Sequence, residues 1–314
     1  MELRHLRYFQ AVAEELHFAR AAARLHIGQS PLSRAIKELE EELGVALFVR
    51  TTRSTRLTRA GEQFLDHVRR IFTALQQARD AVQAATRGFH GQLRVALSGG
   101  ITSSYLSALL AQSRQEDPEL DIRLFEVPLS QQIKGLHDDL YDVGFAHSNE
   151  VGDGIAATPA WRDVLMVAVP ARHPLLAHKR IPLDELLRYP LVLCDPQICE
   201  GRAKHVDRIL RQVSIEPIIA ERVTTGDLMM ALVSAGFALG LTDAAHIIAN
   251  RESGVVARPL ALRVPPLTTY LLRPDREPLE VLTRFIERVQ AIESPESPKL
   301  ISARDLDSME KPAQ

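Results

Sequence analysis

Residues 16–61 read LHFARAAARLHIGQSPLSRAIKELEEELGVALFVRTTRSTRLTRAG, and this stretch decides the fold of the N-terminal part of the chain. Its basic residues form two runs that contain no acid, at Arg20, Arg24, Arg34 and Lys37 and then at Arg50, Arg53, Arg56 and Arg59. Glutamates at positions 38 and 40–42 separate the runs. An alanine-rich helix, a turn at residues 26–28, a second helix and an arginine-rich hairpin form the pattern of a helix-turn-helix with a wing, a shape that fits one helix into a DNA major groove.

The helices of this segment carry apolar stripes at helical spacing. The stripes consist of Leu6, Phe9, Ala13 and Leu16 before the turn and of Leu32, Ile36, Leu39 and Leu43 after it. We expect the two stripes to share a small core. Ser30 before Pro31 has the chemistry of an N-cap followed by a first helical turn, so we expect Ser30 to open the recognition helix.

A long helix is predicted from about residue 59 to 87. Its apolar residues alternate spacings of four and three, at Phe64, Val68, Ile71, Leu75, Ala78, Val82 and Ala85. This is a heptad seam, and it is too long for the N-terminal unit to bury alone. We therefore expect the same helix of a second subunit to cover it; the alternative is a helix that packs on its own chain.

Beyond residue 91, strand-like and helical segments alternate, which predicts an α/β fold with parallel sheets. The expected strands are 93–97, 121–127, 142–147, 164–170, 191–195, 218–223, 238–242 and 268–274. Helices are expected up to about 116 and over 132–140, 202–212, 227–234 and 279–292. Because the last strand and helix lead back toward the first half, we expect two lobes with a cleft between them.

These segments predict five parts of the chain. They are a winged helix-turn-helix (1–58), a linker and dimerisation helix (59–88), a first lobe (91–161 with 267–292), a second lobe (162–266) and a disordered tail (293–314). The tail mixes Ser, Pro, Glu and Lys with few bulky apolar residues.

Composition narrows the class of protein. The 314 residues are 46% apolar and 25% charged with a net charge of −2, which is an ordinary globular balance and argues against unspecific coating of nucleic acid. No signal peptide or long apolar run is evident, so we expect a cytoplasmic protein without a membrane partner.

The sequence offers little for metal or catalytic chemistry. Cys194 and Cys199 form no disulfide framework or zinc motif; we expect a buried thiol at a strand end and a loop thiol, with a redox switch as the alternative. No metal-binding, phosphate-loop or nucleophile-elbow motif is present, so we expect no metal, no cofactor and no enzyme.

The order of these parts resembles the LysR-type transcriptional regulators. The local phrases are also similar: MELRHLRYF (1–9), AAARLHIGQSPLSRAIKELEEELGVALFVR (21–50) and LTRAGEQFL (57–65). With LMVAV (165–169) and HPL (173–175), they look closest to the branch that controls aromatic-compound catabolism. The resemblance implies a homotetramer built as a dimer of dimers, and lobes folded like type 2 periplasmic binding proteins with an inducer in the cleft.

The resemblance also implies which residues face DNA. On the recognition helix they are Gln29, Ser30, Pro31, Ser33, Arg34 and Lys37, and on the wing Arg50 and Arg53. Arg34 can read guanine with two hydrogen bonds and Gln29 can pair with adenine, whereas Ser30 and Ser33 are short enough to reach phosphates. Arg53, at the hairpin tip, suits a narrow minor groove. The alternative is a solvated charged face.

The chain departs from the family pattern at two places. Ala19 stands where many members carry Ser or Thr, which removes a hydroxyl that could contact phosphate, and Thr242-Asp243 stands where many have an apolar residue and Pro.

A ligand site is expected where the first strand of the lobes meets its helix. The turn at residues 98–103 offers hydroxyls and helix-start amides, which attract anions, although such a turn can also be plain helix capping. The candidate residues are Ser98, Gly100, Thr102 and Ser103 in this turn, Ser130 and Gln131 after the second strand, His147 after the third, and Pro196, Gln197 and Glu200 in the other lobe. A small carboxylate-bearing inducer fits most of them, whereas Glu200 opposes an anion.

The sequence thus predicts a ligand-responsive transcription factor. Its expected partners are double-stranded promoter DNA, a small-molecule inducer and further copies of itself, with RNA polymerase as an additional candidate. Two alternatives stay open: an enzyme or solute carrier on the two-lobed fold, which would leave residues 1–61 unexplained, and a constitutive architectural DNA binder, which would need no cleft.

Overall fold

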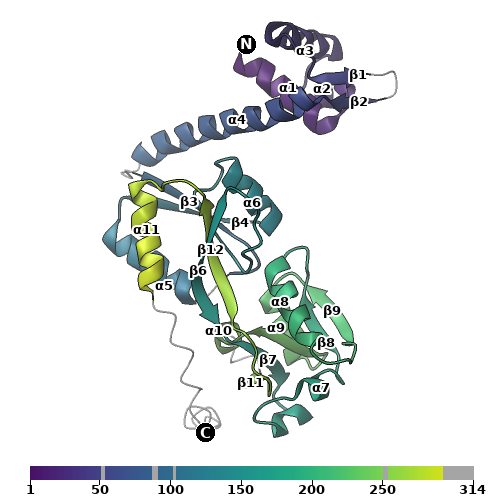
Figure 1. Cartoon of the computed structure of the whole chain (residues 1–314), viewed down its shortest axis with the longest axis vertical. Helices are drawn as coiled ribbons and strands as arrows, with labels where there is room; N and C mark the ends of the chain where they lie inside the picture. Colours follow the sequence, from purple (N-terminus) through teal and green to yellow (C-terminus); the bar gives the residue numbers. More distant parts are fainter. Residues whose placement is uncertain (51–53, 87–90, 102–103, 250–253, 293–314) are drawn as a thin grey trace. The chain divides into compact units, whose positions relative to one another are not determined.

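The computed structural model describes residues 1–50, 54–86, 91–101, 104–249 and 254–292. The chain divides into two compact units (Figure 1). The first comprises Met1–Gln83 with Asp138–Leu140, and the second contains the other described residues. No helix among the described residues combines the length and apolar character needed to cross a membrane.

The N-terminal unit is three helices, a two-stranded hairpin and a long fourth helix. In order they are α1 (Leu3–Glu15), α2 (Phe18–Arg24), α3 (Gln29–Leu43), β1 (Phe48–Arg50), β2 (Thr55–Leu57) and α4 (Arg59–Thr86). β1 and β2 pair antiparallel, and the apolar stripes of α1 and α3 bury Phe9, Leu32 and Ile36 completely in one core. This is the winged helix-turn-helix that the sequence predicts.

The turn before α3 differs from the prediction at one residue. Gly28, in extended conformation and without a side-chain cap, is the N-cap, and α3 already begins at Gln29. Ser30 is therefore the second residue of the helix and does not cap it. The turn before α3 bends at His26, whose φ of 55° lies in the left-handed region. This backbone turn leads into the helix without a serine side chain as its cap.

The predicted seam of α4 divides into two parts. Val68 is fully buried in the N-terminal core and Phe64 packs against that core, so this part of the helix packs on its own chain. Farther along, Ile71 is 39% and Val82 67% exposed, and within the described chain they remain uncovered.

The first lobe of the second unit is built on one five-stranded sheet. Its elements are β3 (Gly91–Leu97), α5 (Ser104–Glu116), β4 (Leu120–Glu126), α6 (Leu129–His137), β5 (Val143–Ala146), β6 (Ile155–Asp163), β12 (Leu267–Pro274) and α11 (Glu280–Ala291). The strand order is β4-β3-β5-β12-β6. Trp161, Phe145 and Phe285 are fully buried in its core.

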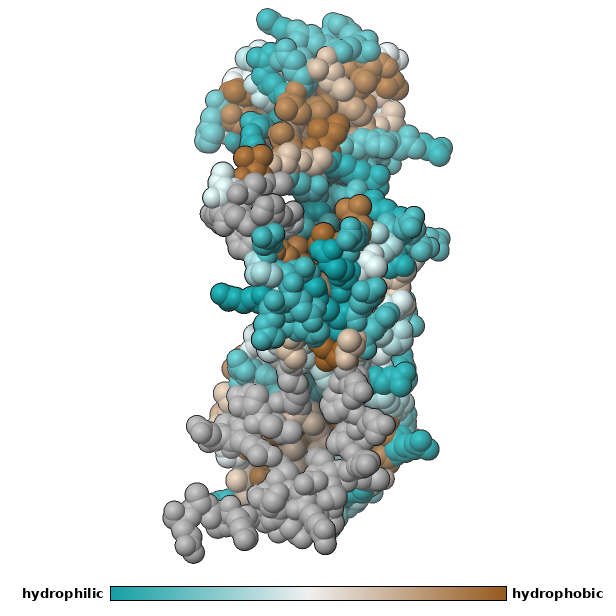
Figure 2. Space-filling model, turned by 90° about the vertical axis from the view of Figure 1, so that its left-hand side faces the viewer, coloured by the Kyte–Doolittle hydropathy of each residue, from teal (hydrophilic) through white to brown (hydrophobic). Residues whose placement is uncertain are grey.

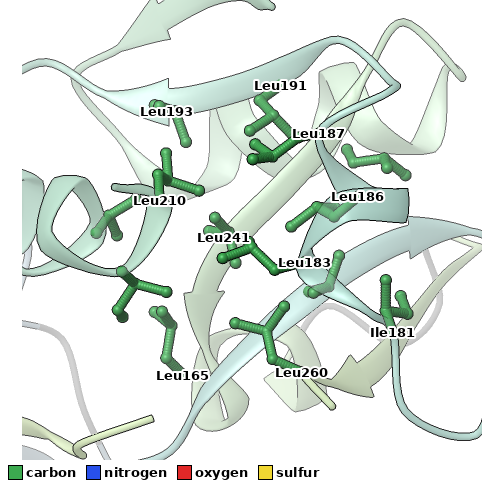
Figure 3. Packing of buried hydrophobic residues seen from close by; sticks show 14 of the residues in the cluster. Leu165, Ile181, Leu183, Leu186, Leu187, Leu191, Leu193, Leu210, Leu241 and Leu260 are labelled. Carbon is green, nitrogen blue, oxygen red and sulfur yellow. The ribbon is translucent and has the colours of Figure 1, made fainter. Parts of the chain in front are cut away.

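The second lobe has a sheet of the same size. Its elements are β7 (Leu165–Pro170), a 3₁₀ turn (Pro174–Ala177), α7 (Leu183–Leu186), β8 (Leu191–Cys194), α8 (Glu200–Leu210), β9 (Ile219–Val223), α9 (Gly226–Ser234), β10 (Leu239–Asp243), α10 (Ala244–Ala249) and β11 (Val255–Pro259). The strand order is β11-β7-β10-β8-β9. Figure 3 shows the leucines of one of its cores, among them Leu186, Leu191 and Leu241, converging between the sheet and the helices.

The expectation of purely parallel sheets is wrong. In the first lobe β12 runs antiparallel to β5 and β6, and in the second β7 runs antiparallel to β10 and β11. The reason is the double crossing between lobes: β6 leads directly into β7, and β12 brings the chain back. β7, which enters the second lobe, and β12, which returns to the first, therefore run against the parallel strands of their sheets.

Several element limits also differ from the sequence prediction. α6 begins at Leu129 and ends at His137, so Ser130 and Gln131 lie in its first turn and not in a strand-end loop. β6 (Ile155–Asp163) was not predicted as a strand. The short α7 and α10 and the strand β11 were also not predicted, because segments of this length carry little periodicity. The tail from 293 lies outside the described residues.

Candidate DNA-binding surface and interlobe site

The recognition helix α3 has one exposed polar face. Gln29, Ser30, Pro31, Arg34 and Lys37 are exposed and Ser33 is half-buried. The opposite face places Leu32, Ile36 and Leu39 in the core, where all three are fully buried. Lys37 Nζ lies 3.4 Å from Glu41 Oε1, an exposed pair that a phosphate can displace at little cost. The helix can therefore present these side chains to a partner without disturbing its packing.

Other members of the basic run have partners within the protein. Arg24 Nη1 lies 2.8 Å from Glu14 Oε2, and Arg20 Nη2 donates to the carbonyl oxygen of Glu15 at 2.6 Å. These acids lie on α1, outside the segment in which the basic run was counted. On α3 itself, Arg34 and Lys37 are the basic side chains of the exposed face.

Arg50 is held by the recognition helix. Its guanidinium donates to Glu40 Oε2 at 2.8 Å and lies 4.7 Å over the ring of Phe18. Glu40 Oε1 accepts from the backbone N–H groups of Leu47 and Phe48, at 2.8 and 3.0 Å. Glu40 thus fixes the start of the wing, and Arg50 completes this anchor. Arg53 lies outside the described residues.

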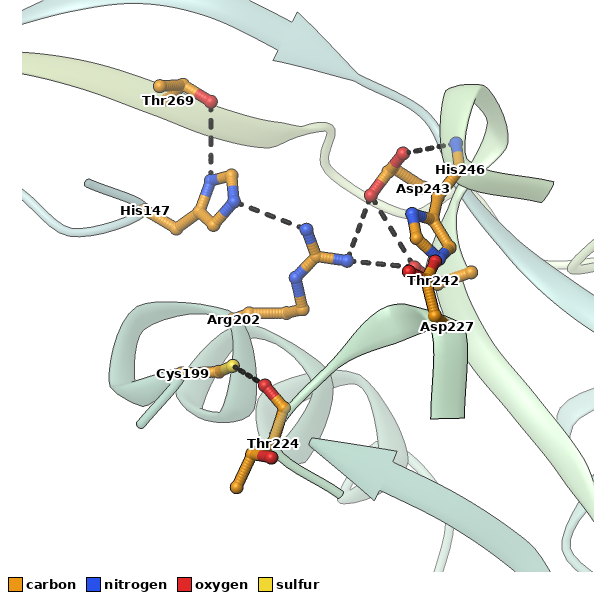
Figure 4. A network of polar contacts seen from close by, with 9 residues as sticks. All are labelled: His147, Cys199, Arg202, Thr224, Asp227, Thr242, Asp243, His246 and Thr269. Atoms are coloured by element: carbon orange, nitrogen blue, oxygen red, sulfur yellow. Dashed lines mark hydrogen bonds and ion pairs between the residues drawn. The ribbon is translucent and has the colours of Figure 1, made fainter. Parts of the chain in front are cut away.

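A buried polar cluster joins the two lobes of the second unit (Figure 4). Arg202, 7% exposed on α8, donates from Nη1 to Thr242 Oγ1 at 2.8 Å and to Asp243 Oδ2 at 2.9 Å. Its Nη2 lies 3.4 Å from Nε2 of His147, a residue of the first lobe. Nδ1 of His147 lies 3.3 Å from Thr269 Oγ1 on β12.

Burial controls the protonation of this cluster. Burial, together with the charge of Arg202, lowers the pKa of His147 to about 3, so its imidazole is neutral and can accept from Arg202. Burial raises the pKa of nearby Asp163 to about 6, and the charge of Asp243 adds to the rise. For Asp243 burial acts in the same upward direction, but Arg202 outweighs it and holds the pKa of this carboxyl below its usual range.

Some of the predicted ligand residues lie close together in the structure. The turn after β3 lies beside the second lobe, since a Cβ built on Gly99 would be 3.7 Å from His147 Cδ2 and 3.8 Å from Cys199 Cα. Ser98 in this turn is 4% exposed, whereas Gly100 is exposed with a φ of 68°. Thr102 and Ser103 lie outside the described residues. The structure thus brings the turn, His147 and the start of α8 together.

The remaining predicted residues are more exposed. Ser130, Gln131, Pro196 and Gln197 are all exposed. Next to the first two, Gln132 is the buried residue, and its Nε2 donates to the carbonyl oxygens of Ala96 and Phe145. Glu200 Oε1 lies 3.0 Å from Lys204 Nζ, so its charge is offset by a neighbour.

A cavity of about 220 Å³ also opens between the lobes. Its lining is largely polar and comes from the loop after β5, from α8, from the crossing before β12 and from β12 itself: His147, Ser148, Asn149, Glu150, Gly201, Lys204, His205, Arg208, Pro265, Pro266, Leu267, Thr268 and Tyr270. Of the predicted ligand residues that the structure describes, His147 alone belongs to this lining.

Sequence reasoning missed the central residue of the interlobe site. Arg202 was not selected, although Thr242-Asp243 were noted as a departure from the family pattern. When a buried strand ends in Thr and Asp, these side chains require a hydrogen-bond donor in the interior. Thr242-Asp243 could therefore have indicated a buried basic side chain nearby. Among the described residues, no group of three or more His, Cys, Asp or Glu side chains is arranged to hold a metal ion.

Comparisons with known proteins agree with this architecture. Residues 3–62 match the model of the bacterial regulatory helix-turn-helix protein, lysR family, and residues 86–292 match the LysR substrate binding domain. The chain is 35% identical over 249 residues to the uncharacterized HTH-type transcriptional regulator YnfL of Escherichia coli, covering 78% of this chain and 82% of that protein. It is 32% identical over 290 residues to the regulator TcbR of Pseudomonas sp. strain P51, with coverages of 92% and 98%.

Solved structures give the same result. Full-length CbnR complexed with its target DNA is 30% identical to this chain with a TM-score of 0.68, covering 93% of this chain and 99% of CbnR. Full-length BenM is 29% identical with a TM-score of 0.58, with coverages of 95% and 100%. These relatives are transcriptional regulators and not enzymes. The chain therefore belongs to the LysR family of DNA-binding transcriptional regulators and carries both a helix-turn-helix and a substrate-binding domain.

Proposed function

We propose that this regulator reads promoter DNA with the exposed face of α3 and responds to a small molecule bound between its lobes. The observation that carries the first part is the division of α3 into a buried apolar face and an exposed face with Gln29, Arg34 and Lys37. In this proposal residues 1–58 bind DNA, 59–88 link and dimerise, and 91–161 with 267–292 and 162–266 are the two effector lobes. The protein would act in the cytoplasm, where RNA polymerase is an additional candidate partner.

Arg34→Ala tests the reading face. Arg34 is exposed, so the variant should fold, but it loses a bidentate contact to a base worth about 1–3 kcal/mol of discrimination. Arg211→Ala, at an exposed position of the second lobe, makes the same change of net charge and serves as the control. Fluorescence anisotropy with a duplex from the protein's own promoter at fixed salt should show weaker specific binding for Arg34→Ala alone. Equal affinities for both variants would remove Arg34 from the reading face.

The inducer is proposed to lie where the turn after β3 faces the start of α8. Ser98, Gly100, Thr102 and Ser103 would contribute hydroxyls and amides, Ser130, Gln131 and His147 would line the first-lobe side, and Pro196, Gln197 and Glu200 the second-lobe side. The ion pair of Glu200 with Lys204 supports an anionic ligand, because it reduces the repulsion that Glu200 would otherwise exert on a carboxylate. A ligand shifts the lobes only through its different affinity for their two arrangements.

A thermal-shift screen of small aromatic and aliphatic acids tests this assignment. A ligand at 100 times its dissociation constant stabilises the protein by about 2.7 kcal/mol. Ser98→Ala and Gln197→Ala should reduce the shift given by a hit, whereas Gln212→Ala, beyond the end of α8, should leave it unchanged. A hit that shifts all three variants as it shifts the wild type binds elsewhere.

We also propose that the exposed part of α4 is a contact between copies of the chain. Supporting observations are the exposed Ile71 and Val82 and a groove of about 540 Å³ in the N-terminal unit, lined by Leu43, Val45, Leu47, Ala60, Gln63, Phe64, Asp66, His67 and Arg70. Figure 2 shows hydrophobic surface gathered over this unit. Apolar side chains that are exposed next to one another favour an interaction site. A dimer of dimers is the assembly that the family resemblance implies.

A further inference from the structure

The cavity of about 220 Å³ between the lobes lies along one face of α8. Lys204, His205 and Arg208 line it from the second lobe, and their spacings of three and four residues make them neighbours on the helix surface. The first lobe faces them with residues 147–150, after β5, and with Thr268 of β12. A molecule in this cavity would therefore contact both lobes.

The charge of Lys204 is balanced within the protein. Its Nζ lies 3.1 Å from Glu150 Oε2 of the first lobe and 3.0 Å from Glu200 Oε1 on its own helix. The contact with Glu150 is also a hydrogen bond, which Lys204 donates from one lobe to the other. Lys204 and these two carboxylates together add no positive charge to the cavity.

Arg208 is the other cation of the lining, and it has no such partner. Its side chain is exposed, and no hydrogen bond or ion pair joins its guanidinium to a residue within the described part of the chain. A guanidinium has only donors, and its planar fork binds two oxygen atoms of an anion at once. Arg208 therefore makes the cavity suitable for an anionic group.

His205 adds a buried hydrogen-bonding atom to the same lining. Its Nε2 is buried and has no hydrogen-bond partner among the residues that the structure describes. The ring hydrogen-bonds to the backbone of Pro265, and because proline has no N–H, the Pro265 carbonyl oxygen is the acceptor and Nδ1 the donor. Burial, with the charge of Arg208, lowers the pKa of His205, so the ring is neutral at neutral pH and carries one proton. Nε2 is therefore an acceptor that needs a donor from outside the protein.

We propose that this cavity is a ligand site for a small acid that carries a hydroxyl group beside its anionic group. The anionic oxygens would accept hydrogen bonds from Arg208, and the hydroxyl would donate to His205 Nε2. Monohydrogen phosphate and 2-hydroxy carboxylic acids both have this combination of groups. Sulfate and simple carboxylic acids have the anionic oxygens without the hydroxyl.

The site is separate from the proposed inducer position at the turn of residues 98–103. Of the residues assigned to that position and described by the structure, the cavity shares only His147. A ligand here would favour one arrangement of the lobes through its different affinity for the two. Ser98→Ala and Gln197→Ala should leave binding to this cavity unchanged, so the two assignments can fail independently of each other.

Titration calorimetry of the full-length protein tests the role of the hydroxyl. The ligands are phosphate and lactate, with sulfate and propanoate as the analogues without a hydroxyl, all at the same ionic strength. The wild type should bind phosphate and lactate about fivefold more tightly than their analogues, the usual effect of one hydrogen bond. His205→Asn keeps an amide donor for the Pro265 carbonyl but removes Nε2, so it should bind each ligand and its analogue equally.

Two charge variants test the anionic group. Arg208→Gln should weaken the binding of phosphate and lactate about tenfold, because a charged donor is lost. Arg211→Gln makes the same change of net charge just beyond the end of α8, outside the lining, and should bind as the wild type does. Glu150→Gln removes a negative charge from the lining and should strengthen binding.

Four outcomes would overturn the proposal. They are no binding of phosphate or of lactate to the wild type, equal loss in Arg208→Gln and Arg211→Gln, a loss caused by Ser98→Ala, and a hydroxyl preference that persists in His205→Asn. Binding of only one of the two ligands with the expected dependences would support the site and identify its source of the hydroxyl. Arg208 and Glu150 are exposed, so the charge variants decide the result even where His205→Asn lowers stability.

Discussion

Asp163 and Asp243 are two carboxyls of the same region with opposite behaviour. Asp243 accepts from Arg202 and from the backbone N–H of His246, and these partners hold its charge in place. Asp163 is half-buried near Asp243, and burial together with the charge of Asp243 outweighs Arg202 and raises the pKa of Asp163 to about 6. Asp163 lies at the end of β6, where the chain crosses between lobes, so its ionisation acts on that crossing.

Asp163→Asn should therefore stabilise the protein at neutral pH. A carboxyl whose pKa is raised by folding contributes stability below its unfolded pKa and loses that contribution as pH rises through about 6. The variant should be about 1–3 kcal/mol more stable than the wild type at pH 7.5, and the difference should disappear toward pH 4. Urea denaturation across this pH range is the measurement. Asp153→Asn, at an exposed position, is the control, and a difference of the same size at pH 4 would contradict the assignment.

Asp243→Ala should be strongly destabilising, because it leaves the Arg202 guanidinium buried without its carboxylate. Removal of one partner of a buried ion pair costs about 3–5 kcal/mol. The double variant Arg202→Met, Asp243→Leu removes both charges and should recover most of that loss in chemical denaturation. A cost below about 1 kcal/mol for Asp243→Ala would mean that water reaches this pair.

At the scale of single residues, the sequence predicted which side chains are exposed better than it predicted which buried side chains pair with each other. The face of α3 could be predicted because helical periodicity alone separates Arg34 from Ile36. The pairing of Arg202 with Asp243 could not, because it depends on how α8 packs beside the end of β10, a tertiary arrangement without a local signal. The pairing of Arg50 with Glu40 could not be predicted either, because Arg50 lies on β1 and Glu40 on α3.

Gly61 allows α4 to begin against the wing. A Cβ at this position would lie 2.1 Å from the carbonyl oxygen of Leu47, and the contact is with backbone that cannot rotate away. Gly61→Ala should destabilise the N-terminal unit by about 1–3 kcal/mol, the usual cost of overpacking. Hydrogen exchange should become faster in β1 and the first turns of α4. Gln63→Ala, exposed on the same helix, should not accelerate it; equal exchange in both variants would show that the strand shifts freely.

Ile71→Asp tests the exposed part of the α4 seam. Ile71 is 39% exposed in the single chain, so an aspartate there is compatible with folding, but it would bury an unpaired charge between two helices in a dimer. We expect a smaller assembly in analytical ultracentrifugation and weaker DNA binding, and Leu75→Asp should behave alike. Gln76→Glu adds the same charge away from the seam and should keep the wild-type assembly. An unchanged assembly for Ile71→Asp would exclude the seam as the interface.

The apolar residues of the heptad pattern in α4 have two different physical roles. Phe64 and Val68 continue the apolar stripe because the N-terminal core needs them, and Ile71 and Val82 continue it without a partner in the described chain. Periodicity reports that a face is apolar and not what covers it, so the sequence could not separate the two parts.

At the scale of the whole molecule, the order of elements was predictable and the direction of some strands was not. Alternation of strands and helices indicated two α/β lobes, and the return of 268–274 indicated the second crossing. The antiparallel placement of β7 and β12 follows from those crossings, and hydropathy carries no information on strand direction. The family resemblance added the expectation that these lobes fold like type 2 periplasmic binding proteins.

The central claim is that one chain couples DNA reading by α3 to ligand binding between the lobes. The most direct measurement is a DNase footprint of the full-length protein on its own promoter, with and without a saturating acid from the thermal-shift screen. We predict a specific footprint in both conditions, with a changed length or cleavage pattern when the ligand is bound. An identical footprint in both, for a ligand that raises the melting temperature, would contradict the coupling and indicate a constitutive DNA binder.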